Sequence, residues 1–206
     1  MNCSVSTPFG EIVTGFSTGV SAPVAQRTVC SEVEWQQWRT DSVTAEVFVG
    51  PFAPRLPEAK RVAGCLAVLW RVRAVTPVTG ISFSCQWRSL PAGADGGPDA
   101  GEGLDALTWS IGRATFSLGT EDGEFLAARA LKEDGMPRRL APELNVATVG
   151  YLPGGLRVPF SSLAPGELLQ VQFLIAWTAP DAVDTADTWF AVDQRHSEVV
   201  RQLTVW

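Results

Sequence analysis

The chain has 206 residues, 46% of them hydrophobic and 18% charged, with a formal net charge of −6. These values are typical of one packed globular domain. The acidic balance argues against nucleic acid or an anionic membrane surface as the partner, because basic side chains drive binding to both. No apolar run approaches the roughly 20 residues that span a bilayer.

Residues 1–30 are rich in Ser, Thr, Val and Gly and nearly uncharged. We expect them to form an extended N-terminal arm or edge strand, with a candidate strand at Glu11–Phe16. The alternative is an arm that adds its strand to the sheet of a neighbouring subunit. The first residues show neither the basic nor the apolar segment of a secretory signal, which predicts cytoplasmic folding, with or without assembly into a particle.

The segment Ser31–Arg39 interrupts the β pattern. Ser31 and Glu34 have the spacing of a helix capping box, and Trp35 and Trp38 lie three residues apart. This spacing predicts a short helix near residues 31–39 that lays both tryptophans on a sheet.

Alternation of apolar and polar residues, bounded by Gly and Pro, predicts the strands that follow. In chain order they are Ser42–Gly50, Arg61–Val75, Ile81–Ser89, Leu107–Leu118 with a β-bulge at Gly112, Glu124–Leu131 after a tight turn at Asp122-Gly123, Leu144–Leu152, Leu156–Phe160, Leu168–Trp177, Thr188–Val192 and Val199–Trp206.

The most apolar of these strands is Leu168–Trp177. Leu169, Val171 and Phe173 share one face, while Gln170 and Gln172 point the other way until later residues make both faces apolar. In Arg61–Val75 one face is apolar throughout, and the other is apolar at first and turns polar at Arg71 and Arg73. Both are expected to be central strands of a sheet that is covered on two sides.

Many short strands without βαβ alternation predict an all-β fold. We expect residues 31–206 to form a single antiparallel β-sandwich domain with jelly-roll connectivity. An immunoglobulin-like Greek key is the second choice.

The cysteines Cys3, Cys30, Cys65 and Cys85 contain no C-x-x-C pair, and the chain has one histidine, His196. We therefore expect no metal site, and no nucleotide motif indicates a cofactor. Cys65 and Cys85 lie in apolar strand patterns and are predicted to fill the core. A Cys3–Cys30 disulfide stays open, although a cytoplasmic setting argues against it.

The segment Asp95–Asp105 is a loop by composition, with four acidic side chains and no basic one. Oxygen-rich loops suit calcium, but the spacing does not match the EF-hand pattern. A solvated loop is the favoured interpretation, and calcium binding is the alternative.

Catalytic constellations are sparse. His196 lies in the polar stretch QRHSE, where we expect a surface residue, and no G-x-S-x-G motif supplies a nucleophile. Glu32/Glu34 and Glu121/Glu124 are the candidate carboxylate pairs for a glycosidase, the least unfavourable enzyme class. Glu34 is assigned to a helix cap and the second pair flanks a predicted turn, so we expect no catalytic residues and no enzyme.

Eight tryptophans stand against one tyrosine. Four of the tryptophans fit inward-facing strand positions. The other four, Trp35, Trp38, Trp189 and Trp206, are less clearly buried and are candidate contacts with a partner or ligand.

Two function classes follow. The first is a non-enzymatic structural protein, a subunit of a larger particle or appendage such as a virion coat or decoration protein, which associates with itself or another protein. The alternative is a binding module that recognises a carbohydrate or a protein partner, including immunity-type binding of a basic partner.

Overall fold

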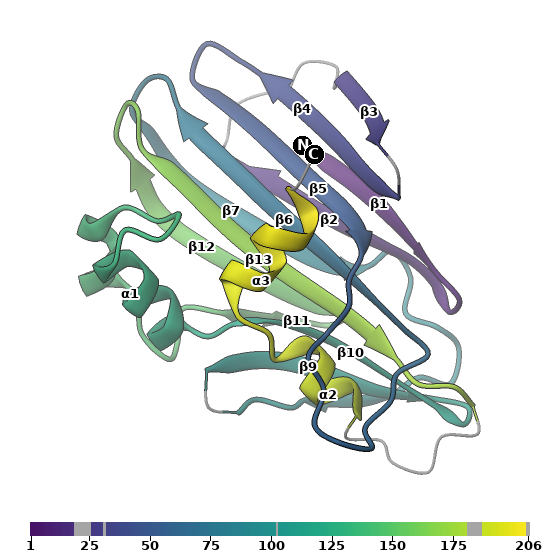
Figure 1. Cartoon of the computed structure of the whole chain (residues 1–206). Coiled ribbons are helices and arrows are strands. Elements are labelled where there is room, and N and C mark those ends of the chain that lie inside the picture. The colour runs from purple at the N-terminus through teal and green to yellow at the C-terminus, as the bar shows by residue number, and fades with distance from the viewer. Residues whose placement is uncertain (19–25, 31, 102, 181–186, 205–206) are drawn as a thin grey trace.

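The computed structural model describes residues 1–18, 26–30, 32–101, 103–180 and 187–204, and of residues 26–30 only the backbone. Antiparallel strands build two sheets (Figure 1). The five-stranded sheet has the order β1 (Asn2–Thr7), β2 (Gly10–Ser17), β7 (Val78–Trp87), β12 (Gly155–Leu163) and β11 (Gly150–Leu152). The eight-stranded sheet has the order β3 (Gln26–Cys30), β4 (Val33–Arg39), β5 (Val43–Pro51), β6 (Gly64–Ala74), β13 (Leu168–Trp177), β10 (Ala114–Glu121), β9 (Leu104–Ile111) and β8 (Asp95–Pro98).

The expected all-β antiparallel sandwich is thereby confirmed. Its finer assignment to a jelly roll or a Greek key stays a prediction, as does the division of the chain at residue 30. The main core lies between the sheets, where Trp70 contacts Phe16 and Phe83 at ring-centroid distances of 6.1 and 6.3 Å. Cys85 is fully buried in this core, as its strand pattern indicates.

Two helices near the C-terminus, α2 (Asp187–Val192) and α3 (His196–Leu203), cover the outer face of the eight-stranded sheet (Figure 1). A second apolar cluster lies beneath them and includes Cys65, Leu69 and Leu174. The central strands of the eight-stranded sheet are therefore buried on both faces. This confirms the two-sided burial predicted for β6 and β13, and the bounds of β13 agree with the predicted strand.

The helix α1 (Gly123–Leu131) and the 3₁₀-helix η1 (Arg138–Glu143) pack on each other. They add Leu126, Ala130 and Leu140 to the main core. In the chain, α1 follows directly on β10.

The predicted helix near residues 31–39 is wrong. Val33–Arg39 is strand β4, which pairs with β3 and β5. Residues three apart lie on opposite faces of a strand. Trp38 accordingly enters the main core and stacks on Trp70 at 5.6 Å, while Trp35 packs against the outer cluster. Cross-strand pairing and burial on both faces outweigh the capping-box spacing.

The predicted bulge at Gly112 is also wrong. The change of phase arises because β9 and β10 are two strands of a hairpin, and Gly112 lies in the turn between them with φ of +62°. A two-residue turn with a positive φ is the usual way to close such a hairpin.

The tight turn at Asp122-Gly123 is wrong as well, because Asp122 caps a helix. Its Oδ1 accepts a hydrogen bond of 2.8 Å from the backbone N–H of Phe125, so the predicted strand Glu124–Leu131 is α1 instead. A side chain that satisfies a free N–H at a helix start favours the helix over the turn.

The last two predicted strands are wrong in the same sense. Thr188–Val192 lies in α2, and the described part of Val199–Trp206 lies mostly in α3. His196, Val199 and Leu203 are the buried residues of α3, at spacings of three and four. This spacing forms one face of a helix, and that face covers the sheet.

Candidate functional site

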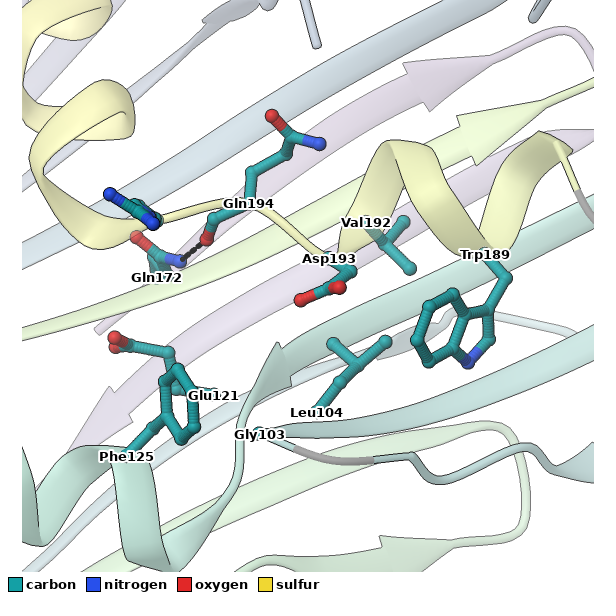
Figure 2. Close-up of a pocket in the computed structure, with 10 residues that line it drawn as sticks. Gly103, Leu104, Glu121, Phe125, Gln172, Trp189, Val192, Asp193 and Gln194 are labelled. Atoms are coloured by element: carbon teal, nitrogen blue, oxygen red, sulfur yellow. Dashed lines mark hydrogen bonds between the residues drawn. The ribbon is translucent and has the colours of Figure 1, made fainter. Parts of the chain in front are cut away.

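A pocket of about 430 Å³ opens on the outer face of the eight-stranded sheet, between α1, α2 and the segment that joins α2 to α3 (Figure 2). Its volume lies in the range of small-molecule sites. Leu104 of β9 and Val192 of α2 give it an apolar floor, and both belong to the outer cluster. The remaining lining is aromatic, charged or amide.

Aromatic rings mark the two ends of the pocket. Figure 2 shows Trp189 at one end and Phe125 at the other, with Leu104, Val192 and Asp193 between them. Phe125 is 49% exposed, and Trp189 is half-buried. The indole Nε1–H of Trp189 donates to the backbone carbonyl of Asp99 at 3.1 Å, which fixes the ring in place.

Two glycines before β9 make room for these rings. A Cβ at Gly101 would lie 2.4 Å from Cζ2 of Trp189, and a Cβ at Gly103 would lie 2.6 Å from Cε2 of Phe125. Gly103 also has φ of +83°, a conformation that other residues seldom adopt. Each ring therefore packs directly against a glycine backbone, so the turn ahead of β9 positions both aromatic ends.

Gly101→Ala is expected to push the indole of Trp189 out of place and to lower the free energy of unfolding by about 1–3 kcal/mol, the usual cost of overpacking. Gly97→Ala is the matched control, because nothing lies within 4 Å of a Cβ at that glycine. Thermal unfolding and near-ultraviolet circular dichroism measure both effects. Equal behaviour of the two variants would contradict the packing of Trp189 on Gly101.

The Phe125 end of the pocket contains a buried ion pair. Glu121 of β10 pairs with Arg129 of α1, and both side chains are more than nine-tenths buried. The guanidinium also donates to the backbone carbonyls of Asp134 (3.1 Å) and Gln170 (3.1 Å). Burial raises the pKa of Glu121, and the Arg129 charge opposes that rise. The pair adds no net charge to the pocket.

His196 lies behind this end of the pocket and is not the surface residue that the sequence predicts. It is 3% exposed, with Nδ1 3.1 Å from Oε1 of Gln172 and Nε2 3.2 Å from Oε1 of Gln170. Burial lowers the pKa of His196 to about 2, and Arg129 contributes to the shift. A neutral ring has one N–H, so it donates to one of these two oxygens, and that hydrogen bond holds the first turn of α3 against β13.

The segment between α2 and α3 supplies the most accessible polar groups. Asp193 and Arg195 both line the pocket and are exposed, and partial burial raises the pKa of Asp193. Within the described ranges, the Asp193 carboxylate has no hydrogen-bonding partner. Its side chain points into the space between the two aromatic ends (Figure 2).

Gln194 fixes this segment between its two charged neighbours. Its amide forms a fork on the backbone of Arg55, accepting from the N–H at 2.9 Å and donating to the carbonyl at 3.1 Å. Its own carbonyl accepts from Nε2 of Gln172 at 3.0 Å, as Figure 2 shows. Asp193 and Arg195 are therefore held by a preorganised backbone, as a recognition site requires.

Of the tryptophans predicted as contacts, Trp189 lines the pocket. Trp35 is half-buried elsewhere on the outer face, and its Nε1 is buried without a partner among the described residues. Trp38 is 4% exposed in the main core, where no ligand reaches it. Trp206 lies outside the described residues.

The predicted carboxylate pairs do not meet in this pocket. Glu121 lines it, whereas Glu124 is exposed on α1. Glu34 lies in β4 and Glu32 directly before that strand, and neither lines the pocket. The second pocket carboxylate, Asp193, was missed because the sequence indicated only a polar loop there. The available signal was the apolar residues on either side of Asp193, Ala191 and Val192 before it and Val199 and Leu203 after it at helical spacing.

The acidic segment Asp95–Asp105 does not gather its carboxylates either. Asp105 is 7% exposed and accepts a 2.5 Å hydrogen bond from the hydroxyl of Tyr151. Glu102 lies outside the described residues. Among the residues that the structure describes, no group of three His, Cys, Asp or Glu side chains could hold a metal ion.

Across the described ranges, none of the helices is long and apolar enough to cross a membrane. No family model matches the chain, and no curated protein matches it. Among solved structures, the chain is similar to one titled "Putative kojibiose phosphorylase from human microbiome", with 6% identity and a TM-score of 0.45. The match covers 82% of this chain and 22% of that protein, so this chain spans about a fifth of its length. Similarity at this level identifies neither an activity nor a ligand.

Proposed function

We propose that this protein is a non-enzymatic binding module that takes a neutral carbohydrate in the pocket between Trp189 and Phe125. The observation that carries the proposal is that two partly exposed aromatic rings line the same pocket as two accessible charged side chains, Asp193 and Arg195. Both charged residues lie on the segment that Gln194 holds in place. A sugar ring has apolar C–H faces that pack on an aromatic side chain and hydroxyl edges that need acceptors and donors.

The available polar groups suit hydroxyls. The Asp193 carboxylate accepts hydrogen bonds and the Arg195 guanidinium donates them, from positions two residues apart in the sequence. By contrast, the amides of Gln172 and Gln194 are engaged with protein groups. A ligand with several hydroxyls would therefore meet an acceptor and a donor in the same pocket as two aromatic rings.

Charge balance favours a neutral ligand. Glu121 is compensated by Arg129, and Asp193 has Arg195 as its neighbour along the chain. A pocket whose charges cancel gives no net attraction to a strongly anionic or cationic molecule. This separates a neutral sugar from an amine or an acid of similar size.

Calorimetric titration with neutral disaccharides (maltose, cellobiose, lactose and sucrose) tests the proposal, with glucosamine and glucuronate as charged comparators. We expect a dissociation constant on the order of 1 mM for at least one neutral sugar, and at least about tenfold weaker binding by Trp189→Ala. Trp35→Ala is the matched control, since Trp35 is also half-buried on the outer face but lies outside the pocket.

Two outcomes would contradict the proposal. One is the absence of heat across the whole panel, and the other is unchanged affinity in Trp189→Ala. Release of monosaccharide from a bound disaccharide would contradict its non-enzymatic part.

An assembly role remains a second proposal, and the observation that supports it is the edge position of strand β1 in the five-stranded sheet. A variant that lacks residues 1–30 would not test this role, because β2 contributes Ile12 and Phe16 to the main core. Such a deletion would unfold the sandwich whether or not the segment makes subunit contacts.

A further inference from the structure

Strand β1 is an edge of the five-stranded sheet. Its hydrogen bonds with β2 show which of its backbone groups face the sheet and which face outward. Met1 and Phe16 exchange two backbone hydrogen bonds, from Phe16 N–H to Met1 at 2.9 Å and from the Met1 amino group to Phe16 at 2.8 Å. Bonded and non-bonded pairs alternate along an antiparallel ladder. Hence Cys3, Val5 and Thr7 are bonded to β2, and the backbone groups of Asn2, Ser4 and Ser6 point away from it.

Nothing among the described residues pairs with the outward backbone groups of β1, apart from a 3.8 Å contact between Cys3 Sγ and the Ser4 carbonyl. The side chains of Asn2, Ser4 and Ser6 are exposed, while those of Cys3 and Val5 are buried. The strand therefore presents an edge of six residues in unbroken register, with polar side chains on its exposed face.

The other sheet edges carry the features that discourage strand pairing. β11 has three residues, β8 begins at Asp95 and ends at Pro98, and β3 contains Arg27 in its sequence. Short length, charge and proline are the common protections of an edge. β1 has no charged residue, no proline and no bulge.

We propose that β1 pairs with β1 of a second copy of this chain, so that two five-stranded sheets join into one continuous sheet. This interface is separate from the pocket and goes beyond the binding function. Antiparallel pairing about a two-fold axis at Ser4 sets Asn2 opposite Ser6 of the other copy and Ser4 opposite itself. Each of these pairs exchanges backbone hydrogen bonds.

The chemistry of the edge favours a second copy over an unrelated strand. In a two-fold contact each residue meets its own kind or its symmetric partner, so any charge at the axis would meet a like charge. The three outward residues are neutral and bear hydrogen-bonding side chains. Among the described residues, the two nearby cations are both engaged: Arg88 donates to Ser4 Oγ at 3.1 Å and is ion-paired with Glu11, and the Met1 amino group donates to the Phe16 carbonyl.

Sedimentation velocity from about 1 µM to about 500 µM tests the interface. Wild-type protein is expected to form a dimer as concentration rises, and Ser4→Lys is expected to raise the dimer dissociation constant at least about tenfold by placing like charges at the axis. Ser17→Lys is the matched control, because it adds the same charge to an exposed serine of the interior strand β2. Thermal unfolding verifies that both variants stay folded.

Hydrogen exchange gives a second, residue-level readout. The amides of Asn2, Ser4 and Ser6 should become protected as concentration rises, while other exposed amides do not change. A wild-type protein that stays monomeric over the whole range would overturn the proposal. So would a dimer that survives Ser4→Lys, or one that Ser17→Lys disrupts equally.

Discussion

Phe173→Ala is expected to lower the free energy of unfolding by about 3–5 kcal/mol. Phe173 lies at the centre of β13, is fully buried, and pairs across the sheet with Val68 of β6. Removing its ring leaves a cavity between two well-packed layers that cannot collapse around it. Chemical denaturation measures the change.

Phe125→Ala is the matched control for Phe173→Ala. It removes the same ring from a side chain that is 49% exposed on α1, so the loss should stay below about 1 kcal/mol. A similar loss in both variants would mean that burial in the sandwich is not what makes Phe173 important.

Arg129→Met is expected to cost about 3–5 kcal/mol, because it leaves the buried Glu121 carboxylate without its cation. The double variant Glu121→Gln/Arg129→Met removes the stranded charge and should recover much of that loss. Urea unfolding of the wild type, the single variant and the double variant gives the comparison. A double variant as unstable as the single one would show that the packing of Arg129, rather than its charge, stabilises the protein.

The pH dependence of Arg129→Met gives a further check. Burial already raises the pKa of Glu121 in the presence of Arg129, and loss of the cation removes the main opposing effect. A carboxyl whose pKa is raised by folding binds its proton more tightly in the folded state. The deficit of Arg129→Met should therefore shrink as the pH falls towards the pKa of an unfolded glutamate, and grow as the pH rises.

Strong alternation made the central strands predictable from sequence. In β6 and β13 nearly every residue of one face is apolar, and part of the second face is apolar too, at the start of β6 and at the end of β13. This pattern favours strands that are covered on both sides. The sequence did not predict the helices that cover the outer face of this sheet. The helices α2 and α3 have six and eight residues, and β-branched residues in both resemble short strands.

Local spacing failed where tertiary contacts decide the structure. The capping-box spacing at Ser31 and Glu34 is also compatible with a strand, and pairing of β4 with β5 selects the strand. At Asp122 the reverse occurred, since a residue common in turns caps a helix. Both segments show that propensity is weaker than burial and pairing.

Only two of the residues that line the pocket, Trp189 and Glu121, were identified from the sequence. Trp189 was singled out for its chemistry, and Glu121 as half of a carboxylate pair with the wrong partner. Its actual neighbours in the site come from β9, α1, β13 and the segment after α2, which are distant in the sequence. No local pattern relates such segments, because their convergence depends on how the helices cover the sheet.

The central claim is that a neutral carbohydrate binds between Trp189 and Phe125. The most direct test is the nuclear magnetic resonance spectrum of the tryptophan indole N–H groups during titration with the disaccharide that calorimetry identifies. The Trp189 signal, assigned by its loss in Trp189→Phe, is predicted to shift and to saturate with sugar concentration, while the Trp35 signal stays in place. A Trp189 signal that does not move while sugar binds would contradict the claim.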